Sequence, residues 1–305
     1  MLSIRSQCIR AVAVLLVSLV CSSTTKAQTP ALPPVNMGNT TFLDGIAEPG
    51  FVAEEIAFVV HDDRLPSTTN DSPPHNPDVN TEVALTHLAW ISRAHLLGGW
   101  PGAETLFSAD HVQVGRIGSS WGAGDVTIGP ILQLPERHIF GMSIYQRAAL
   151  DFDVPLGTYS IQAPVNIGSH AWDVHPSYTV TAMPHKHVET SWRLHYLWNS
   201  RNDSAPVSSG ATTEQAGQAV HGNGTLAYEV HKHAYLGVNT YYLRQLTRHQ
   251  LDGVSVPGLQ QIAGIGPGVV VQDGKWFYFV NTYHELGARD MAEGNKLTLR
   301  VMRVF

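Results

Sequence analysis

Histidines are the most numerous side chains in this sequence that could bind a metal, with sixteen in the chain. Two His-x-His pairs, His185 with His187 and His231 with His233, are the strongest local signs of a metal site. Residues two apart on a strand can point the same way, but zinc needs three or four convergent ligands. Both pairs also fall at predicted turns. The pattern therefore favours solvated surface histidines, and we expect neither a bound metal nor a cofactor.

A serine and a histidine on one strand could support nucleophilic catalysis. His175 and Ser177 are two residues apart, so they share one face of the strand that contains them. A hydrolase would also need an orienting group within hydrogen-bond reach of the histidine. Their face also carries Asp173 and is predicted to meet water, away from any lipid substrate. We therefore expect a protein that is not an enzyme.

Charged side chains alternate with aromatic ones between Glu189 and Trp198. One parity holds Trp192, Leu194, Tyr196 and Trp198, and the other holds Glu189, Ser191, Arg193 and His195. Successive side chains of a β-strand point to opposite faces, so this segment has one aromatic face and one charged face. A soluble sandwich strand seldom combines these two faces. A transmembrane barrel strand does, because lipid covers one face and a polar lumen the other.

The same two-residue period continues from Phe51 to the end of the chain and predicts about twelve strands. In the first strand Val52, Ile56 and Phe58 oppose Ala53, Glu55 and Ala57. The predicted connections are long near 62–80, 117–124, 155–170, 199–214, 249–258 and 287–295, and short near 93–97, 135–137, 183–186, 231–233 and 272–275. Bacterial outer-membrane barrels have an even strand number, long external loops and short periplasmic turns. We therefore predict an all-β fold, a single antiparallel transmembrane β-barrel over residues 51–305.

The first residues predict export. Two arginines, the apolar run 11–21 and small residues ending at Ala27 have the order of a signal peptide. We predict that residues 1–27 are removed. Cys21 could instead indicate a lipoprotein anchor, but the bulky Val20 before it disfavours one.

Removal of that signal peptide changes the composition of the chain. Arg5, Arg10 and Lys26 leave with it, so the 19 basic residues fall to 16 against 25 acidic ones, a net charge of about −9. Both cysteines, Cys8 and Cys21, leave as well, which excludes disulfides and thiolate sites. The negative charge gives no sign of nucleic-acid binding. No later apolar run approaches the ~18 residues that a membrane helix needs.

Residues 28–50 are interrupted by prolines and glycines and predict an irregular N-terminal segment. Only 39–47 within it is compactly patterned, and Asp44 is its charged residue. Two interpretations stay open: an exported linker, or a short plug in the lumen of the barrel.

The end of the chain alternates from Lys296 and stops on an aromatic residue, Phe305, as outer-membrane barrels commonly do. We expect the barrel assembly machinery to recognise this last strand. Arg303 shares the parity of Leu299 and Val301, where lipid-facing residues are expected. We interpret it as reaching the lipid headgroups near the strand end.

Several motifs together resemble a known family. They are NTTFLDGIA (39–47), GAGDVTIGP (122–130), DVPLGTY (153–159), VNIG (165–168), RLHY (193–196) with NSRND (199–203), GIGP (264–267) and EG (293–294). The chain resembles the Gram-negative outer-membrane β-barrel proteins labelled as phenol-degradation meta-pathway proteins. The resemblance implies a barrel in the outer membrane, linked with uptake of aromatic or other hydrophobic compounds, and it carries over no catalytic residue. The ending 301–305 departs from the aromatic-rich ending usual in the family.

Charged residues on the parity of Arg193 are predicted to line the lumen, because a base facing lipid at the midplane costs about 2–4 kcal/mol. The candidate lumen residues are Asp44, Glu55, Asp125, Asp173, His175, Arg193, His195 and Glu229. Their charges either set the selectivity of a path and hold a plug, or form a salt-bridged interior that fills a narrow barrel.

These observations predict an outer-membrane channel or transporter for passive uptake of small hydrophobic or aromatic compounds. Its partners would be outer-membrane lipid, these small molecules and the barrel assembly machinery, with no nucleic acid. A twelve-stranded lumen is narrow, so passage should be slow and selective. The alternatives are a structural or adhesive barrel that works through its polar loops, and an outer-membrane lipase-type hydrolase.

Overall fold

The computed structural model describes residues 31–66 and 77–305. The predicted signal peptide, residues 1–27, lies outside the described residues, as do residues 28–30 of the predicted N-terminal segment. Among the described residues, no helix is long and apolar enough to cross a membrane.

The described elements are almost all β-strands. In chain order they are β1 (Gly50–Arg64), β2 (Val79–Ile91), β3 (Trp100–Val114), β4 (Gly118–Ala123), β5 (Val126–Ile139), β6 (Met142–Val154), β7 (Asp173–His185), β8 (Val188–Asn199), β9 (Arg201–Asn202), the 3₁₀ helix η1 (Val207–Ser209), β10 (Glu214–Gln215), β11 (Ala219–His231), β12 (Ala234–Gln245), β13 (Gln250–Leu251), β14 (Val254–Ser255), β15 (Gln261–Asp273), β16 (Trp276–Arg289) and β17 (Glu293–Val304).

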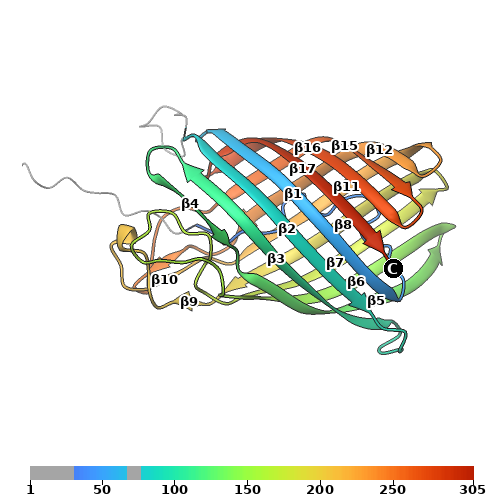
Figure 1. The fold of residues 1–305 in the computed structure, drawn as a ribbon, viewed down its shortest axis with the longest axis horizontal. Helices are drawn as coiled ribbons and strands as arrows, with labels where there is room; N and C mark the ends of the chain where they lie inside the picture. Colours follow the sequence, from blue (N-terminus) through green and yellow to red (C-terminus); the bar gives the residue numbers. More distant parts are fainter. Residues whose placement is uncertain (1–30, 67–76) are drawn as a thin grey trace, which may run out of the picture.

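The long strands form one closed antiparallel ring (Figure 1). Thirteen strands follow the order β2-β1-β17-β16-β15-β12-β11-β8-β7-β6-β5-β3-β4, and β2 also pairs with β3, which closes the ring. Both β4 and β5 pair with β3, β4 along residues 109–114 and β5 along 100–106, so the two share one position. The barrel therefore has twelve strand positions, as predicted. Within residues 31–66 and 77–305, each of the twelve long strands pairs on both sides, and the short β4 pairs with β3 alone. Closure thus removes the long free edges at which another chain could add a strand.

The two ends of the barrel differ. Four two-residue turns, 140–141, 186–187, 232–233 and 274–275, lie at one end, which we call the turn end. Phe140 and Gly141 both have positive φ angles, +52° and +79°, the conformation of a tight hairpin turn that matches the twist of its strands. The other end, which we call the loop end, carries the long connections 155–172 and 246–260, and a small sheet of β9, β10, β13 and β14.

Three predicted connections were wrong. The predicted turn at 135–137 lies within β5, where the register shifts between Leu134 and Arg137. Pro135, which has no N–H to donate, falls in this shift, where a strand tolerates proline. The predicted loop at 117–124 is a three-residue turn followed by β4, and the one at 287–295 shrinks to residues 290–292.

A belt of exposed apolar side chains surrounds the outer wall. On β8 the side chains of Trp192 and Leu194 are 58% and 64% exposed, whereas Arg193 and His195 between them are buried inside the barrel. The two faces predicted for this strand are therefore confirmed. Every strand position contributes to the belt through Val59, Trp90, Phe107, Ile128, Leu150, Tyr178, Trp192, Leu226, Val238, Ile265, Val280 and Leu299. An apolar surface this extensive would be costly in water and matches the lipid-facing band of an outer-membrane barrel.

Candidate functional site

Residues 31–49 run through the interior of the barrel, from the loop end to the start of β1 at the turn end (Figure 1). We call them the lumenal segment. Near the loop end, the backbone N–H of Leu32 donates to Gln260 Oε1 at 3.3 Å. Further along, Gly45 N donates to Thr181 Oγ1 at 2.8 Å, and Gln133 Nε2 donates to the Gly45 carbonyl at 3.0 Å. The barrel wall thus holds the segment along its length.

Two arginines of the wall bind Asp44. Arg193 on β8 donates from Nε to Asp44 Oδ2 at 2.8 Å and from Nη2 to Oδ1 at 2.6 Å. Arg147 on β6 donates from Nη2 to the Asp44 carbonyl at 2.9 Å and to its Oδ1 at 3.1 Å. Bidentate arginine–carboxylate pairs are stronger and more directional than neutral hydrogen bonds. Asp44 and Arg193, both expected at the lumen from the sequence, therefore meet in one ion pair.

A second set of polar contacts holds the middle of the lumenal segment. Lys296 Nζ on β17 donates to the Met37 carbonyl at 2.6 Å and to Asn39 Oδ1 at 2.7 Å. The Tyr283 hydroxyl donates to the Gly38 carbonyl at 2.9 Å. These contacts satisfy buried polar groups that irregular backbone would otherwise leave unpaired.

Apolar residues of the segment cover an apolar part of the inner wall. One buried cluster on β12, β15 and β16, formed by Tyr241, Leu243, Ile262, Tyr283 and Ala288, packs against Leu32, Val35 and Met37 of the segment and against Met291. In a second cluster, Phe42 is 1% exposed and packs with Ala227, Val270 and Phe279. The barrel residues of these two clusters, on β11, β12, β15 and β16, define what we call the apolar wall. Without the lumenal segment, the apolar wall would face the lumen directly.

The structure groups some of the predicted lumen residues and separates others. Asp173, His175, Arg193 and His195 are all buried inside the barrel on β7 and β8. Glu229 lies near the turn end, where its carboxylate pairs with His187 Nδ1 at 2.8 Å and accepts from the His233 backbone N–H at 2.9 Å.

Asp125 lies between β4 and β5, where it organises the connection 155–172. Its Oδ1 accepts from Gly157 N at 2.8 Å, and its Oδ2 accepts from the backbone N–H and the hydroxyl of Ser169, both at 2.7 Å. Because these bonds occupy both oxygens, Asp125 supports a loop at the loop end.

The prediction that Glu55 faces the lumen was wrong. Glu55 is exposed on the outer wall, where its carboxylate accepts from Thr86 Oγ1 at 3.0 Å. The neighbouring Glu54 and Ile56 are 7% and 2% exposed and point inward. β1 carries apolar residues on both faces, and on its inner face Val52 packs in the same cluster as Ala47 of the lumenal segment. Because both faces of β1 carry apolar residues, alternation alone assigned the face of Glu55 to the lumen, whereas the opposite face lies there.

The wrong parity for β1 also hid a network of inward-facing ion pairs on β1, β2 and β3. The imidazole of His87 lies between two carboxylates, with Nδ1 3.2 Å from Glu54 Oε2 and Nε2 2.8 Å from Glu104 Oε2. Arg300 on β17 lies 4.0 Å from the same Glu54 oxygen. The correct parity of β1 would have placed Glu54 in the lumen and pointed to these partners.

The serine and histidine candidates do not form a hydrolase arrangement. His175 Nε2 pairs with Asp153 Oδ2 at 2.9 Å, and Ser177 Oγ has no hydrogen-bond partner within residues 31–66 and 77–305. The sequence also contains a Gly-x-Ser-x-Gly pattern at 118–122 that our sequence reasoning overlooked. That pattern forms strand β4 and runs on into β5, whereas a nucleophile elbow is a sharp turn from a strand into a helix.

One loop histidine has a shifted pKa outside the membrane-spanning strands. His249, beside the small sheet, is 1% exposed, and its Nδ1 accepts from Gly217 N at 3.1 Å. Burial lowers the pKa of His249 to about 4, because the charged form loses its hydration. The imidazole is therefore neutral at pH 7 and acts as an acceptor.

A solved outer-membrane channel supports this architecture. No curated protein matches the chain. Among solved structures, an outer membrane channel from Pseudomonas putida F1 has a similar fold, with a TM-score of 0.75 and 16% sequence identity over 89% of this chain and 100% of that one. The translocator domain of the autotransporter NalP from Neisseria meningitidis has a TM-score of 0.48 and 10% identity over 86% and 91% of the two chains.

A family model covers most of the barrel. The model described as "Putative MetA-pathway of phenol degradation" matches residues 62–301. The closed twelve-position barrel and its apolar belt place the protein in the outer membrane of a Gram-negative bacterium. By this match, the chain belongs to the MetA-pathway phenol-degradation family.

Proposed function

We propose that the protein is an outer-membrane channel for small hydrophobic or aromatic compounds, with the lumenal segment as its plug. The apolar wall carries this proposal. Its aromatic and aliphatic side chains on β12, β15 and β16 pack against Leu32, Val35 and Met37 of the lumenal segment. A polar pore would have no use for such a surface inside its lumen, whereas a hydrophobic solute gains about 25 cal/mol for each Å² of apolar area that it removes from water.

The contacts of the lumenal segment fit a plug that opens rarely. Each hydrogen bond from the wall contributes about 0.5–1.5 kcal/mol, and those to charged groups about 1.5–3 kcal/mol. Asp44 and Asn39 engage three cationic side chains of the wall, those of Arg147, Arg193 and Lys296. Displacement breaks many modest contacts together, so the open state would be scarce and passage slow.

Deletion of the segment tests the proposal. Wild-type protein and a variant lacking residues 31–49 are reconstituted in planar bilayers, and single-channel conductance is recorded. We expect small, infrequent openings for the wild type and a steady, larger conductance for the deletion variant. Phenol should then reduce the current of the deletion variant at concentrations where inositol, a polar molecule of comparable size, does not.

Two results would contradict the proposal. An unchanged conductance after deletion would rule out the plug, and equal block by phenol and inositol would rule out the apolar wall as a binding surface. In cells, removal of the protein should lower the rate at which aromatic compounds enter.

We also propose that the last strand is the part recognised by the barrel assembly machinery. Phe305 is 52% exposed at the turn end, and its ring contacts Phe51 with centroids 5.6 Å apart. An F305A variant should reach the outer membrane in smaller amounts while refolding normally in detergent. Equal amounts of both proteins in the membrane would exclude this role for Phe305.

A further inference from the structure

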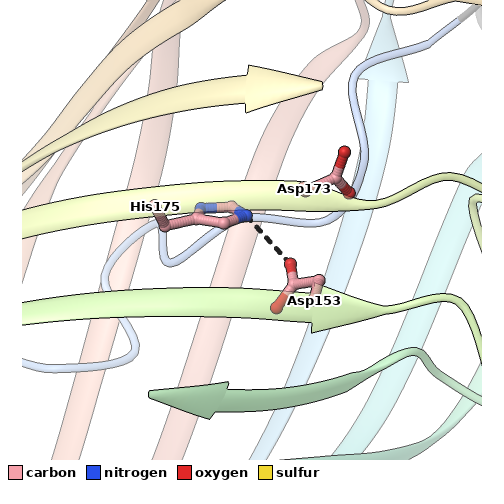
Figure 2. A group of neighbouring side chains, drawn as sticks. All are labelled: Asp153, Asp173 and His175. Atoms are coloured by element: carbon pink, nitrogen blue, oxygen red, sulfur yellow. Dashed lines mark ion pairs between the residues drawn. The ribbon is translucent and has the colours of Figure 1, made fainter. Parts of the chain in front are cut away.

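Three potential metal ligands meet on the inner wall towards the loop end (Figure 2). Asp153 comes from the end of β6, and Asp173 and His175 come from the start of β7. One ligand atom from each residue lies within 4.8 Å of the other two. His175 Nε2 and Asp153 Oδ2, the atoms joined in Figure 2, are 2.9 Å apart.

Asp173 is the residue that this cluster leaves unexplained. Its side chain is 1% exposed, yet neither carboxylate oxygen accepts a hydrogen bond from any described residue. A buried carboxylate without a partner costs several kcal/mol. The nearby Asp151 on β6 is 7% exposed and adds another acidic group, while Arg193 is engaged by Asp44. A bound cation would remove this cost.

A neighbouring hydrogen bond orients the carboxylate of Asp153, as is usual for a metal ligand. Thr127 Oγ1 on β5 donates to Asp153 Oδ1 at 2.6 Å, which leaves Oδ2 directed at His175. Hydrogen bonds of this kind orient the ligands of metal sites. Ligands of a tetrahedral zinc ion lie about 3.4 Å from one another, given bonds of about 2.1 Å. The three ligand atoms, which all lie within 4.8 Å of one another, are thus near the spacing that such an ion requires.

We propose that Asp153, Asp173 and His175 bind one divalent transition-metal ion of the zinc class in the wall of the lumen. An imidazole nitrogen favours such ions over magnesium and calcium, which prefer oxygen ligands alone. Three protein ligands leave one position of a tetrahedral ion for water or for a passing solute. The site goes beyond the proposed channel function, since metal binding and solute passage are measured separately.

Metal titration tests the site. Untagged full-length mature protein, refolded in detergent and stripped of metal, is titrated with Co²⁺ while its visible absorption is recorded, and Zn²⁺ binding is measured by equilibrium dialysis. We expect one equivalent of metal and a spectrum typical of low coordination number. D173N and H175Q should each weaken Zn²⁺ binding by at least about 100-fold, and T127V by about 10–100-fold, as is usual for loss of an outer hydrogen bond.

The matched control is H187Q. His187 also pairs with a carboxylate, that of Glu229, but it lies at the turn end, so its loss should leave the affinity unchanged. Heat-dependent mobility on gels checks that each variant is folded. If the wild type fails to bind one equivalent, or if H187Q weakens binding as much as H175Q does, the proposal is wrong. If D173N fails to fold, the Co²⁺ spectrum of the wild type and the Zn²⁺ affinity of T127V still test the proposed site.

Discussion

Arg193 holds Asp44 in a bidentate pair, with two parallel hydrogen bonds of 2.8 and 2.6 Å between β8 and the lumenal segment. Lysine keeps the charge but cannot reproduce the planar fork of arginine. R193K should therefore weaken the hold on the segment and raise the frequency of single-channel openings. D44N should raise it further, because losing one partner of a buried pair costs about 3–5 kcal/mol.

The matched control for R193K is R201K, since Arg201 of the short strand β9 pairs with Asp203 on the exposed surface of the loop end. Its channel should open as rarely as the wild type. Equal behaviour of R193K and R201K would show that the Arg193–Asp44 pair does not retain the segment.

Alanine substitutions at Gly38 and Gly98 distinguish the effect of backbone strain from the effect of contact with the barrel wall. Its φ angle is +76°, and a Cβ there would lie 2.5 Å from the Tyr283 ring. Gly98 has nearly the same φ, +78°, but a Cβ there meets nothing within 4 Å. Both G38A and G98A should lose about 1 kcal/mol through strain. Only G38A should also displace the lumenal segment and increase conductance, and an equal increase in both would point to strain alone.

Phe42 tests how much the apolar wall contributes to retention of the segment. The side chain is 1% exposed among Ala227, Val270 and Phe279, and Phe→Ala substitutions at such sites cost about 3–5 kcal/mol. F42A should make the segment accessible to added protease at concentrations that leave the wild type intact. F140A, which truncates a ring that is 96% exposed in a turn, should resist protease like the wild type.

The outer belt predicts a depth-dependent penalty for charge. Leu194, 64% exposed in the middle of β8, should face the hydrocarbon, so L194R should lower the free energy of unfolding from bilayers by about 2–4 kcal/mol. Leu246 is 47% exposed just beyond β12 at the loop end, and L246R should cost about 1 kcal/mol or less. Urea unfolding in lipid vesicles measures both, and equal losses would place the belt at the wrong depth.

The loop sheet should weaken in mild acid. Burial holds the pKa of His249 at about 4, whereas an opened loop would return it to about 6.5. The opened loop then binds a proton that the closed loop does not, so closure is fully stable above pH 6.5 and is destabilised as the pH falls from 6.5 to 4. The loss reaches at most about 3 kcal/mol.

Hydrogen exchange in β10 and β13, corrected for the intrinsic rate, would detect this opening. H249N keeps an acceptor but cannot titrate, so its exchange should stay constant over the same range. If H249N shows the same acid sensitivity as the wild type, another group is responsible.

The fold was predictable because one strand was unambiguous. Trp192 and Leu194 against Arg193 and His195 are typical of a wall between lipid and water and are seldom found in a soluble sandwich, and the structure exposes the first two and buries the others. On β1 the prediction failed, because the apolar Val52 and Ile56 share the inward parity with Glu54, and alternation cannot reveal which of two partly apolar faces is inside. Parity separates the two faces of a strand, but it identifies which face is outside only when the interior is polar.

The contacts inside the barrel were less predictable. Asp44 stood out as the charge in a patterned stretch, but its partner Arg147 lies 103 residues away and follows only from the closed sheet. The approach of Asp153 to Asp173 depends in the same way on the register between β6 and β7, where the two residues are direct partners. Local sequence patterns contain no information about such register. The sequence therefore indicated only the His-x-His pairs as possible metal ligands.

The inner surface of the barrel is asymmetric. Apolar side chains gather on β12, β15 and β16, while Arg193, His195 and Asp173 lie on β7 and β8. A molecule crossing an open lumen would therefore meet an apolar surface on one side of the barrel and an ionic surface on the other. A ring bearing a hydroxyl group on one edge could satisfy both by keeping a fixed orientation, whereas a plain alkane could not. Such a barrel would sort solutes by amphipathic shape as well as by width.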